Sequence, residues 1–180
     1  MNLLSIFQHR RSIRKYTGTP IDDAALTQII QAGLLSASSR SIRPWEFIVV
    51  KDKEMLCRLS ECRSGAARML AGADAAIVVI ANAEASDVWI EDCSIAMANM
   101  HLMADSLGVG SCWIQGRLRT ATTADSGTAS VTTEDYVREC LDFPEGYKLE
   151  AILSLGMPAE EKAPTELSEL PVEKVHYETF

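Results

Sequence analysis

Residues 87–116 read DVWIEDCSIAMANMHLMADSLGVGSCWIQG and carry the clearest structural pattern in the chain. Apolar side chains recur at helical spacing over residues 90–107 and form one stripe: Ile90, Cys93, Met97, Met100, Ala104 and Leu107. Gly108 lies where a helix commonly ends in a left-handed glycine, and residues 110–115 are typical of a strand. The pattern predicts a long core or interface helix that leads directly into a strand.

Further helices are predicted on both sides of this stretch. Three of them are predicted over residues 3–10, 22–34 and 53–61. A fourth helix is predicted to end near Leu141. Asp22 and Asp52 can serve as N-caps, and Thr132 with Asp135 resembles a capping box.

Three more strands are predicted, over residues 45–51, 75–81 and 147–155, and Gly156 with Pro158 ends the last of them. Helices and strands therefore alternate, with no internal repeat and no linker. We expect one α/β or α+β domain over residues 1–180, in which residues 159–180 form an acidic and mostly irregular tail. Residues 120–133 lack periodicity and predict a mobile loop, placed as a lid near a pocket.

Composition excludes several classes of protein. The chain has 180 residues, 47% of them hydrophobic, and a net charge of -8, which disfavours nucleic acid and anionic membrane surfaces as partners. The first residues, MNLLSIFQHRRS, place apolar before basic side chains, the reverse of a secretory signal. No apolar run is long enough to span a bilayer, so we expect a cytoplasmic protein without a membrane segment.

The cysteines and histidines do not predict a metal site. Five cysteines occur, an odd number, and no pair has CxxC spacing; no HxxxH pair is present either. Glu173 and His176 have ExxH spacing, but they lie in the irregular tail without a second such pair. We expect reduced and mostly buried thiols and no bound metal.

The strongest local signal for chemistry is RRSIRK over residues 10–15, which gathers four of the 17 basic residues of an acidic chain. Guanidinium groups bind phosphate oxygens in pairs, and a serine hydroxyl adds a neutral donor. The segment suits a phosphorylated cofactor. A solvated basic turn is the alternative reading of this motif by itself.

Two other stretches offer polar or close backbone contacts. SSRSIRPWEF over residues 38–47 presents amide, hydroxyl and guanidinium donors on a loop that Pro44 stiffens before a strand. GVGSCWIQG over residues 108–116 is glycine-rich, but it precedes a strand, so it is not the dinucleotide fingerprint. No P-loop, GxSxG or HExxH motif occurs, so the sequence lacks the motifs of classical hydrolases and kinases.

Taken in order, these stretches resemble the nitroreductase family of FMN flavoproteins over nearly the whole chain. The family's RRSxRxY element is seen over residues 10–16, and its SxxNxQPWxF element over residues 38–47. A long helix with Asn99 then runs into GVGSCWI, a glycine–proline end follows over residues 156–158, and VHY stands at residues 175–177. Five elements in this order are specific for the family, although not for a substrate.

The resemblance implies an α+β protein with three α/β/α layers around a central, mainly antiparallel sheet. It further implies a long core helix at a homodimer interface, an extended C-terminal arm over residues 159–180, and FMN bound by residues of both chains. It assigns Arg10, Arg11, Ser12 and Arg14 to the phosphate, ribityl chain and pyrimidine edge of FMN, Ser39, Ser41 and Arg43 to a pyrimidine-facing loop, and Gln115 and Gly116 to the backbone that faces flavin N5.

This sequence departs from the family pattern in three places. Ser41 replaces the common Asn, and Arg43 replaces the common Gln. Many members also carry a basic pair near the C-terminus that binds the phosphate, whereas residues 166–169 read ELSE here. Lys162 is the nearest base available to stand in for that pair, so we include it among the cofactor-binding residues.

The resulting functional hypothesis is ping-pong electron transfer, in which NADH or NADPH reduces FMN and a small organic acceptor such as a nitroaromatic or quinone then takes the electrons. No side chain need be a nucleophile, because the flavin carries the chemistry. The alternatives are another flavin reaction on the same fold, such as reductive dehalogenation or flavin destruction, and a flavin-binding protein without turnover.

Overall fold

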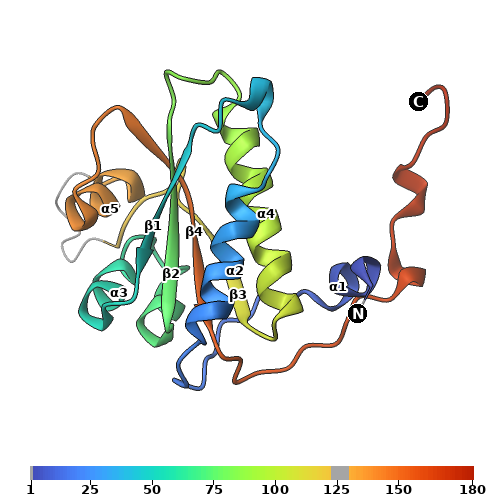
Figure 1. The fold of residues 1–180 in the computed structure, drawn as a ribbon, viewed down its shortest axis with the longest axis horizontal. Helices are drawn as coiled ribbons and strands as arrows, with labels where there is room; N and C mark the ends of the chain where they lie inside the picture. Colours follow the sequence, from blue (N-terminus) through green and yellow to red (C-terminus); the bar gives the residue numbers. More distant parts are fainter. Residues whose placement is uncertain (1, 123–129) are drawn as a thin grey trace.

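Four strands form an antiparallel sheet at the centre of the molecule, in the order β1-β2-β4-β3 (Figure 1). The computed structural model describes residues 2–122 and 130–180. The strands are β1 Trp45–Val50, β2 Ala75–Asn82, β3 Gly110–Gln115 and β4 Tyr147–Gly156. All four predicted strands are confirmed.

Helices cover both faces of this sheet (Figure 1). One layer holds α2 Asp23–Leu34 and α4 Trp89–Ser106; the other holds α3 Lys53–Leu59 and α5 Thr133–Leu141. Two buried apolar clusters lie between the sheet and these layers, one on each face. The expected three-layer α/β/α arrangement with an antiparallel sheet is therefore confirmed.

The central strands are buried along most of their length because both faces of the sheet are covered. In β2 the run Ala75–Ala81 is buried throughout, and β4 is buried from Leu149 onward. The β2–β4 register shifts between Val79, which pairs with Ala151, and Ile80, which pairs with Leu149. Glu150 is thus the extra residue of a β-bulge, a device that re-aims a side chain at a functional edge.

The stripe predicted along α4 packs inside its own chain. Cys93, Met97, Met100 and Ala104 are fully buried, and α4 makes its main helix contact with α2. Of the two roles predicted for this stripe, core or interface, these residues take the core role, since their side chains are buried within the chain. The outward side of α4 is the one available to a partner, and it carries Ile95, which is 43% exposed.

The helix ends follow the predicted capping chemistry with one difference. Asp52 accepts from the Met55 amide and Thr132 from the Asp135 amide, as expected. Gly108 follows α4 with φ +72°, the left-handed geometry expected of it. Asp22 occupies the N-cap position of α2, but its side chain makes no capping hydrogen bond.

Short helical turns and loops complete the chain. The 3₁₀ turn Ser39–Ser41 precedes β1, and Arg68–Gly72 precedes β2. The turns Leu167–Glu169 and Val172–Lys174 lie in the C-terminal tail. The ends of the predicted loop are joined by the Thr120–Thr132 bridge. The lid expected over residues 120–133 falls largely on 123–129, outside the described residues.

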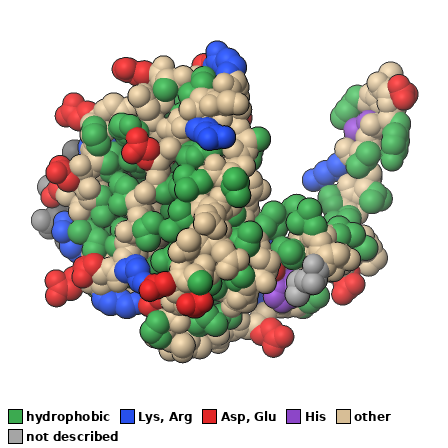
Figure 2. Space-filling view, in the orientation of Figure 1, with side chains coloured by type: hydrophobic (Ala, Val, Ile, Leu, Met, Phe, Trp, Pro, Cys, Tyr) green, Lys and Arg blue, Asp and Glu red, His purple; other side chains and the backbone are tan. Residues whose placement is uncertain are grey.

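Helix α1 Leu3–His9 and the C-terminal residues lie together away from the three layers (Figure 1). The Thr165 amide donates to the Gln8 carbonyl at 2.9 Å, and beyond this contact the tail extends as an arm. Hydrophobic side chains line the arm and its base (Figure 2). The exposed ones are Leu3, Leu4 and Phe7 on α1 and Leu167, Leu170, Val172, Val175, Tyr177 and Phe180 on the arm.

All five cysteines are free thiols, and three of them are buried, in agreement with the sequence-based expectation. Within residues 2–122 and 130–180, no helix has both the length and the apolar composition that crossing a membrane requires.

Candidate functional site

The segment after α1 attaches to the outer edge of β3. Ser12 pairs in parallel with Ser111, and the Ile13 amide donates to the Ser111 carbonyl at 2.9 Å. Gly110 permits this approach, because a Cβ there would lie 2.8 Å from Cγ2 of Ile13. The RRSIR motif is therefore held against the sheet edge by backbone pairing and is not a free turn.

The arm brings Lys162 to the same place. Its Nζ donates to the Ser12 carbonyl at 2.6 Å and lies 3.8 Å from a carboxylate oxygen of Glu160. Arg11 donates to the carbonyl of Ala163, and the Arg14 amide donates to Glu160 at 2.6 Å. The four basic-motif residues and Lys162 form one group, here called the basic cluster: Arg10, Arg11, Ser12, Arg14 and Lys162.

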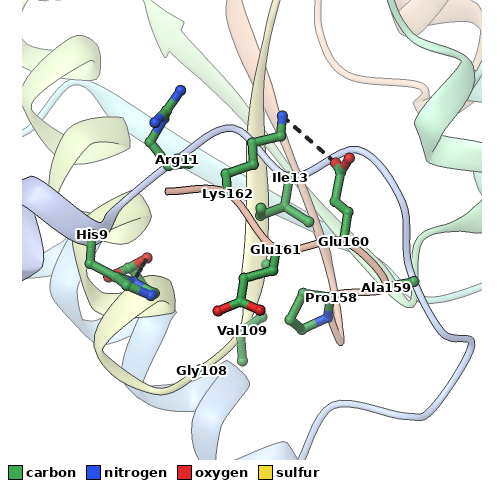
Figure 3. A pocket seen from close by; sticks show the side chains of 12 residues that line it. His9, Arg11, Ile13, Gly108, Val109, Pro158, Ala159, Glu160, Glu161 and Lys162 are labelled. Carbon is green, nitrogen blue, oxygen red and sulfur yellow. Dashed lines mark hydrogen bonds and ion pairs between the residues drawn. The ribbon is translucent and has the colours of Figure 1, made fainter. Parts of the chain in front are cut away.

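A cavity of about 540 Å³ adjoins the basic cluster (Figure 3). Figure 3 shows Arg11 and Lys162 at one side of it, with His9 and Glu161 facing the same space. Further lining residues include Gly108 and Val109 from the α4–β3 turn and Pro158 and Ala159 from the start of the arm. The volume lies within the ordinary range of small-molecule sites.

Two of the three carboxylates that line this cavity, those of Asp105 and Glu160, are already engaged. Asp105 lies 3.0 Å from Nδ1 of His9, and Glu160 accepts from the backbone of Arg14, which lowers the pKa of the Glu160 carboxyl. The guanidinium groups of the cluster thus keep donors available for an anion. The donor set, three guanidiniums, an ammonium and a hydroxyl, fits a phosphate group.

The second predicted group lies elsewhere in the chain. The Ser39 amide donates to Asp92 at 2.8 Å, near the start of α4, and Ser41 and Arg43 are exposed on the same loop. Ser41 and Arg43 have φ of 56° and 53°, left-handed values that cost energy in non-glycine residues and gather at functional sites. A short helical turn, Ser39–Ser41, carries this loop.

Within one chain, the 38–47 loop and the basic cluster lie apart. Arg10 contacts α4 at His101, whereas Ser39 contacts it at Asp92. Nine residues of helix separate the two contacts, a rise of about 13.5 Å. The structure therefore joins the basic cluster with Lys162 and leaves Ser39, Ser41 and Arg43 as a separate group.

Gln115 and Gly116 end β3 in a fixed geometry. The Gln115 carboxamide accepts from the Trp113 indole at 2.9 Å and donates to the Glu150 carbonyl at 3.3 Å. The Gly116 amide donates to the same carbonyl at 3.0 Å. A Cβ at Gly116 would lie 2.5 Å from Cδ2 of the buried Leu149, so the close approach requires glycine.

Glu150 and His101 are polar residues of the site that sequence reasoning missed. Glu150 is 3% exposed, its Oε1 lies 3.4 Å from the Gln115 amide nitrogen, and Oε2 lacks a hydrogen-bond partner within the described part of the chain. Burial raises the pKa of the Glu150 carboxyl above its usual range. An acidic residue inside the apolar run LEAILSL was the available signal.

Comparison with known proteins identifies the family. The model described as the nitroreductase family matches residues 7–68 and 53–157 of this chain. The chain belongs to the nitroreductase family. The matched ranges include the RRSIR motif, the 38–47 loop, α4 and β3, whereas Lys162 lies beyond them.

Individual relatives agree with this assignment. A protein of Archaeoglobus fulgidus, provisionally named NADH dehydrogenase/NAD(P)H nitroreductase, is 37% identical over 88% of this chain and 87% of its own length. The solved structure of an FMN-dependent nitroreductase from Clostridium difficile R20291 is 44% identical, with a TM-score of 0.91 over 98% of this chain and 99% of that chain. A structure from Parabacteroides distasonis, provisionally named like the first, is 30% identical with a TM-score of 0.86 over the full length of both chains.

Glu150→Gln should be more stable than the parent protein, and the difference between the two should grow as the pH rises. Because the pKa of Glu150 is raised in the folded state, that state binds the proton more tightly than the unfolded chain, and stability falls as pH rises through the carboxyl range and above. The Gln variant lacks this loss. We expect its free energy of unfolding to exceed that of the parent by about 1 kcal/mol near pH 8, and by less near pH 5.

Urea unfolding at the two pH values measures this difference. Glu145→Gln is the matched control, because Glu145 is an exposed carboxylate in the turn before β4. Equal stability of Glu150→Gln and the parent protein at both pH values would contradict the role assigned to the buried carboxyl.

Proposed function

We propose that this chain is an FMN-dependent oxidoreductase that passes electrons from NADH or NADPH to a small organic acceptor, such as a nitroaromatic or a quinone. The observation that carries the proposal is the basic cluster on the edge of β3, the same strand that ends in Gln115 and Gly116. A 44% identical structure is named an FMN-dependent nitroreductase, and a 37% identical relative is named for NAD(P)H.

Each group of residues has a role in this proposal. Arg10, Arg11, Ser12 and Lys162 would bind the FMN phosphate and ribityl chain, and Arg14 would place a cation near the pyrimidine edge. Ser39, Ser41 and Arg43 would face the pyrimidine, and Gln115 with Gly116 would present backbone to N5. When bound, FMN supplies hydride chemistry that none of these side chains can perform.

The protein residues then act through position and charge. Backbone pairing to β3 holds the phosphate ligands at the sheet edge, and the Trp113 and Glu150 contacts hold the Gln115 carboxamide in one orientation. The nicotinamide donor and the acceptor would occupy the same pocket in turn, which corresponds to ping-pong kinetics. Such fixed placement of reacting groups is the main contribution a flavoprotein makes to the rate.

We further propose a homodimer whose flavin sites take residues from both chains. The pyrimidine loop and the basic cluster are separated along α4 within one chain, so a second copy would be needed to supply one of them. The outward side of α4, the apolar residues of α1 and those of the arm provide uncovered surface for such a partner. An interface of this kind should be large and obligate.

The purified protein should carry FMN and not FAD, because the basic cluster serves one phosphate and no Rossmann fingerprint serves a dinucleotide. Chromatography of the flavin released by heat identifies it, and the flavin absorbance should bleach on anaerobic addition of NADH or NADPH. FAD, or no flavin after reconstitution, would refute the cofactor assignment. Bound FMN that responds to neither nicotinamide would favour a flavin-binding protein without turnover.

Arg10→Ala and Arg14→Ala should each weaken FMN binding by about 1.5–3 kcal/mol, the usual range for a hydrogen bond to a charged group. Lys162→Ala should weaken it as well, since its ammonium lies against Ser12. Titration of apoprotein with FMN, followed by flavin fluorescence, gives the affinities. Lys174→Ala on the exposed arm is the control for Lys162, and unchanged affinity in all three variants would show that the basic cluster is only a solvated surface.

Ile95→Glu should shift the protein toward monomer and lower its flavin content together, because the change puts a charge on the outward side of α4. Sedimentation velocity monitored at a flavin wavelength measures both quantities. Leu35→Glu serves as the control, since Leu35 is 84% exposed at the end of α2. A parent protein that sediments as a flavin-loaded monomer at micromolar concentration would refute the dimer.

A further inference from the structure

His101 links the long helix to the basic cluster. The imidazole is buried, with 6% of the residue exposed, on the side of α4 that faces β3. Its Nδ1 lies 2.5 Å from Oγ of Ser111, and its Nε2 lies 3.1 Å from Nη1 of Arg10. The side chain therefore bridges a strand residue and the first arginine of the RRSIR motif.

The two contacts define the protonation state of the ring. A guanidinium group can only donate, so Nε2 must be the unprotonated acceptor and Nδ1 must carry the proton that is donated to Ser111. Burial and the nearby Arg10 cation both lower the pKa of His101, to about 4. The imidazole is consequently neutral around pH 7.

Other charged groups near this bridge are paired elsewhere. Asp105, one turn further along α4, pairs with His9 of α1. From the arm, Glu160 accepts from the Arg14 amide and lies 3.8 Å from Lys162, and on β3 burial raises the pKa of the Cys112 thiol. Within the described residues no carboxylate forms a hydrogen bond or ion pair with the imidazole that would offset its protonation.

Ser111 positions two proposed phosphate ligands at once. Its hydroxyl accepts from His101, which holds Arg10, and its backbone pairs with Ser12 and the Ile13 amide. The contact with His101 uses one of the five guanidinium donors of Arg10 and leaves four for an oxyanion. A held guanidinium also loses less side-chain freedom when it binds a ligand.

We propose that His101 is an uncharged positioning residue that aims the Arg10 guanidinium at the FMN phosphate, and that its protonation weakens FMN binding. The inference rests on the proposed function, because it assumes that Arg10 binds the cofactor. A protonated imidazole has two donors and no acceptor, so it cannot accept from Arg10 and repels it as a second cation. The affinity for the FMN phosphate should therefore fall as the pH falls toward the pKa of His101.

Two variants separate positioning from simple packing. His101→Gln keeps a carbonyl oxygen that can accept from Arg10 and an amide that can donate to Ser111, but it does not titrate. His101→Phe keeps a planar ring of similar size and offers no acceptor. His176→Gln is the control for a histidine away from the site, because His176 is exposed on the arm, where its ring lies 4.3 Å from that of Phe180.

The measurement is the FMN dissociation constant from flavin fluorescence between about pH 7.5 and pH 3.5, a range that spans the pKa of His101. Near pH 7.5, His101→Phe should bind FMN about tenfold more weakly than the parent, whereas His101→Gln should stay within about threefold. Toward pH 3.5 the parent should lose more affinity than His101→Gln. Protonation of the FMN phosphate affects both proteins equally and cancels in this ratio, and His176→Gln should keep the pH dependence of the parent.

The Arg10→Ala background adds an independent readout. His101→Phe should cause no further loss of FMN affinity there, because its effect acts through the guanidinium. If His101→Phe does not fold, as judged by circular dichroism, the pH profile of His101→Gln decides. Identical pH profiles of the parent and His101→Gln, or a full additional loss from His101→Phe in the Arg10→Ala background, would overturn this inference alone. A parent protein that binds no FMN would overturn the proposed function with it.

Discussion

The burial of one side of α4 against the sheet is the contact on which the rest of the structure depends. Its side chains at Cys93, Met97, Met100 and Ala104 are removed from solvent between the sheet and α2, and burial of this kind supplies most of the favourable free energy of folding. The same helix carries Asp92 near its start and His101 two and a half turns later. Core packing therefore sets where the 38–47 loop and the basic cluster attach.

The residues of the candidate site assemble along the edge of β3. Antiparallel pairing covers one side of β3 with β4, and the segment after α1 covers the other side through Ser111. Donors from the beginning and the end of the chain thus gather on one strand, with Gln115 and Gly116 at its end. Backbone hydrogen bonds hold Ser12, Ile13 and Gly116 in place. Side-chain hydrogen bonds from Arg11 and Lys162 join the arm to this segment.

Positively charged side chains gather around the site, although the protein as a whole carries a negative charge. The chain carries a net charge of -8, yet cations line the cavity beside Arg11 and Lys162, and two of its three carboxylates, Asp105 and Glu160, already have partners. Two buried titratable groups, His101 and Glu150, are held toward their uncharged forms by burial. Neutral groups at these places orient their neighbours without competing for an anionic ligand.

The sequence by itself determined the secondary structure, the helix caps at Asp52, Thr132 and Gly108, and the stretches that carry the family's pattern, because each depends on residues within a turn or two of one another. Only the tertiary structure decided that Lys162 meets Ser12 across 150 positions and that the α4 stripe faces its own core. It also decided that Glu150 and His101 are buried against Gln115 and Arg10. The reason is physical: periodicity fixes which side chains share a face, whereas the packing of distant segments fixes what that face meets.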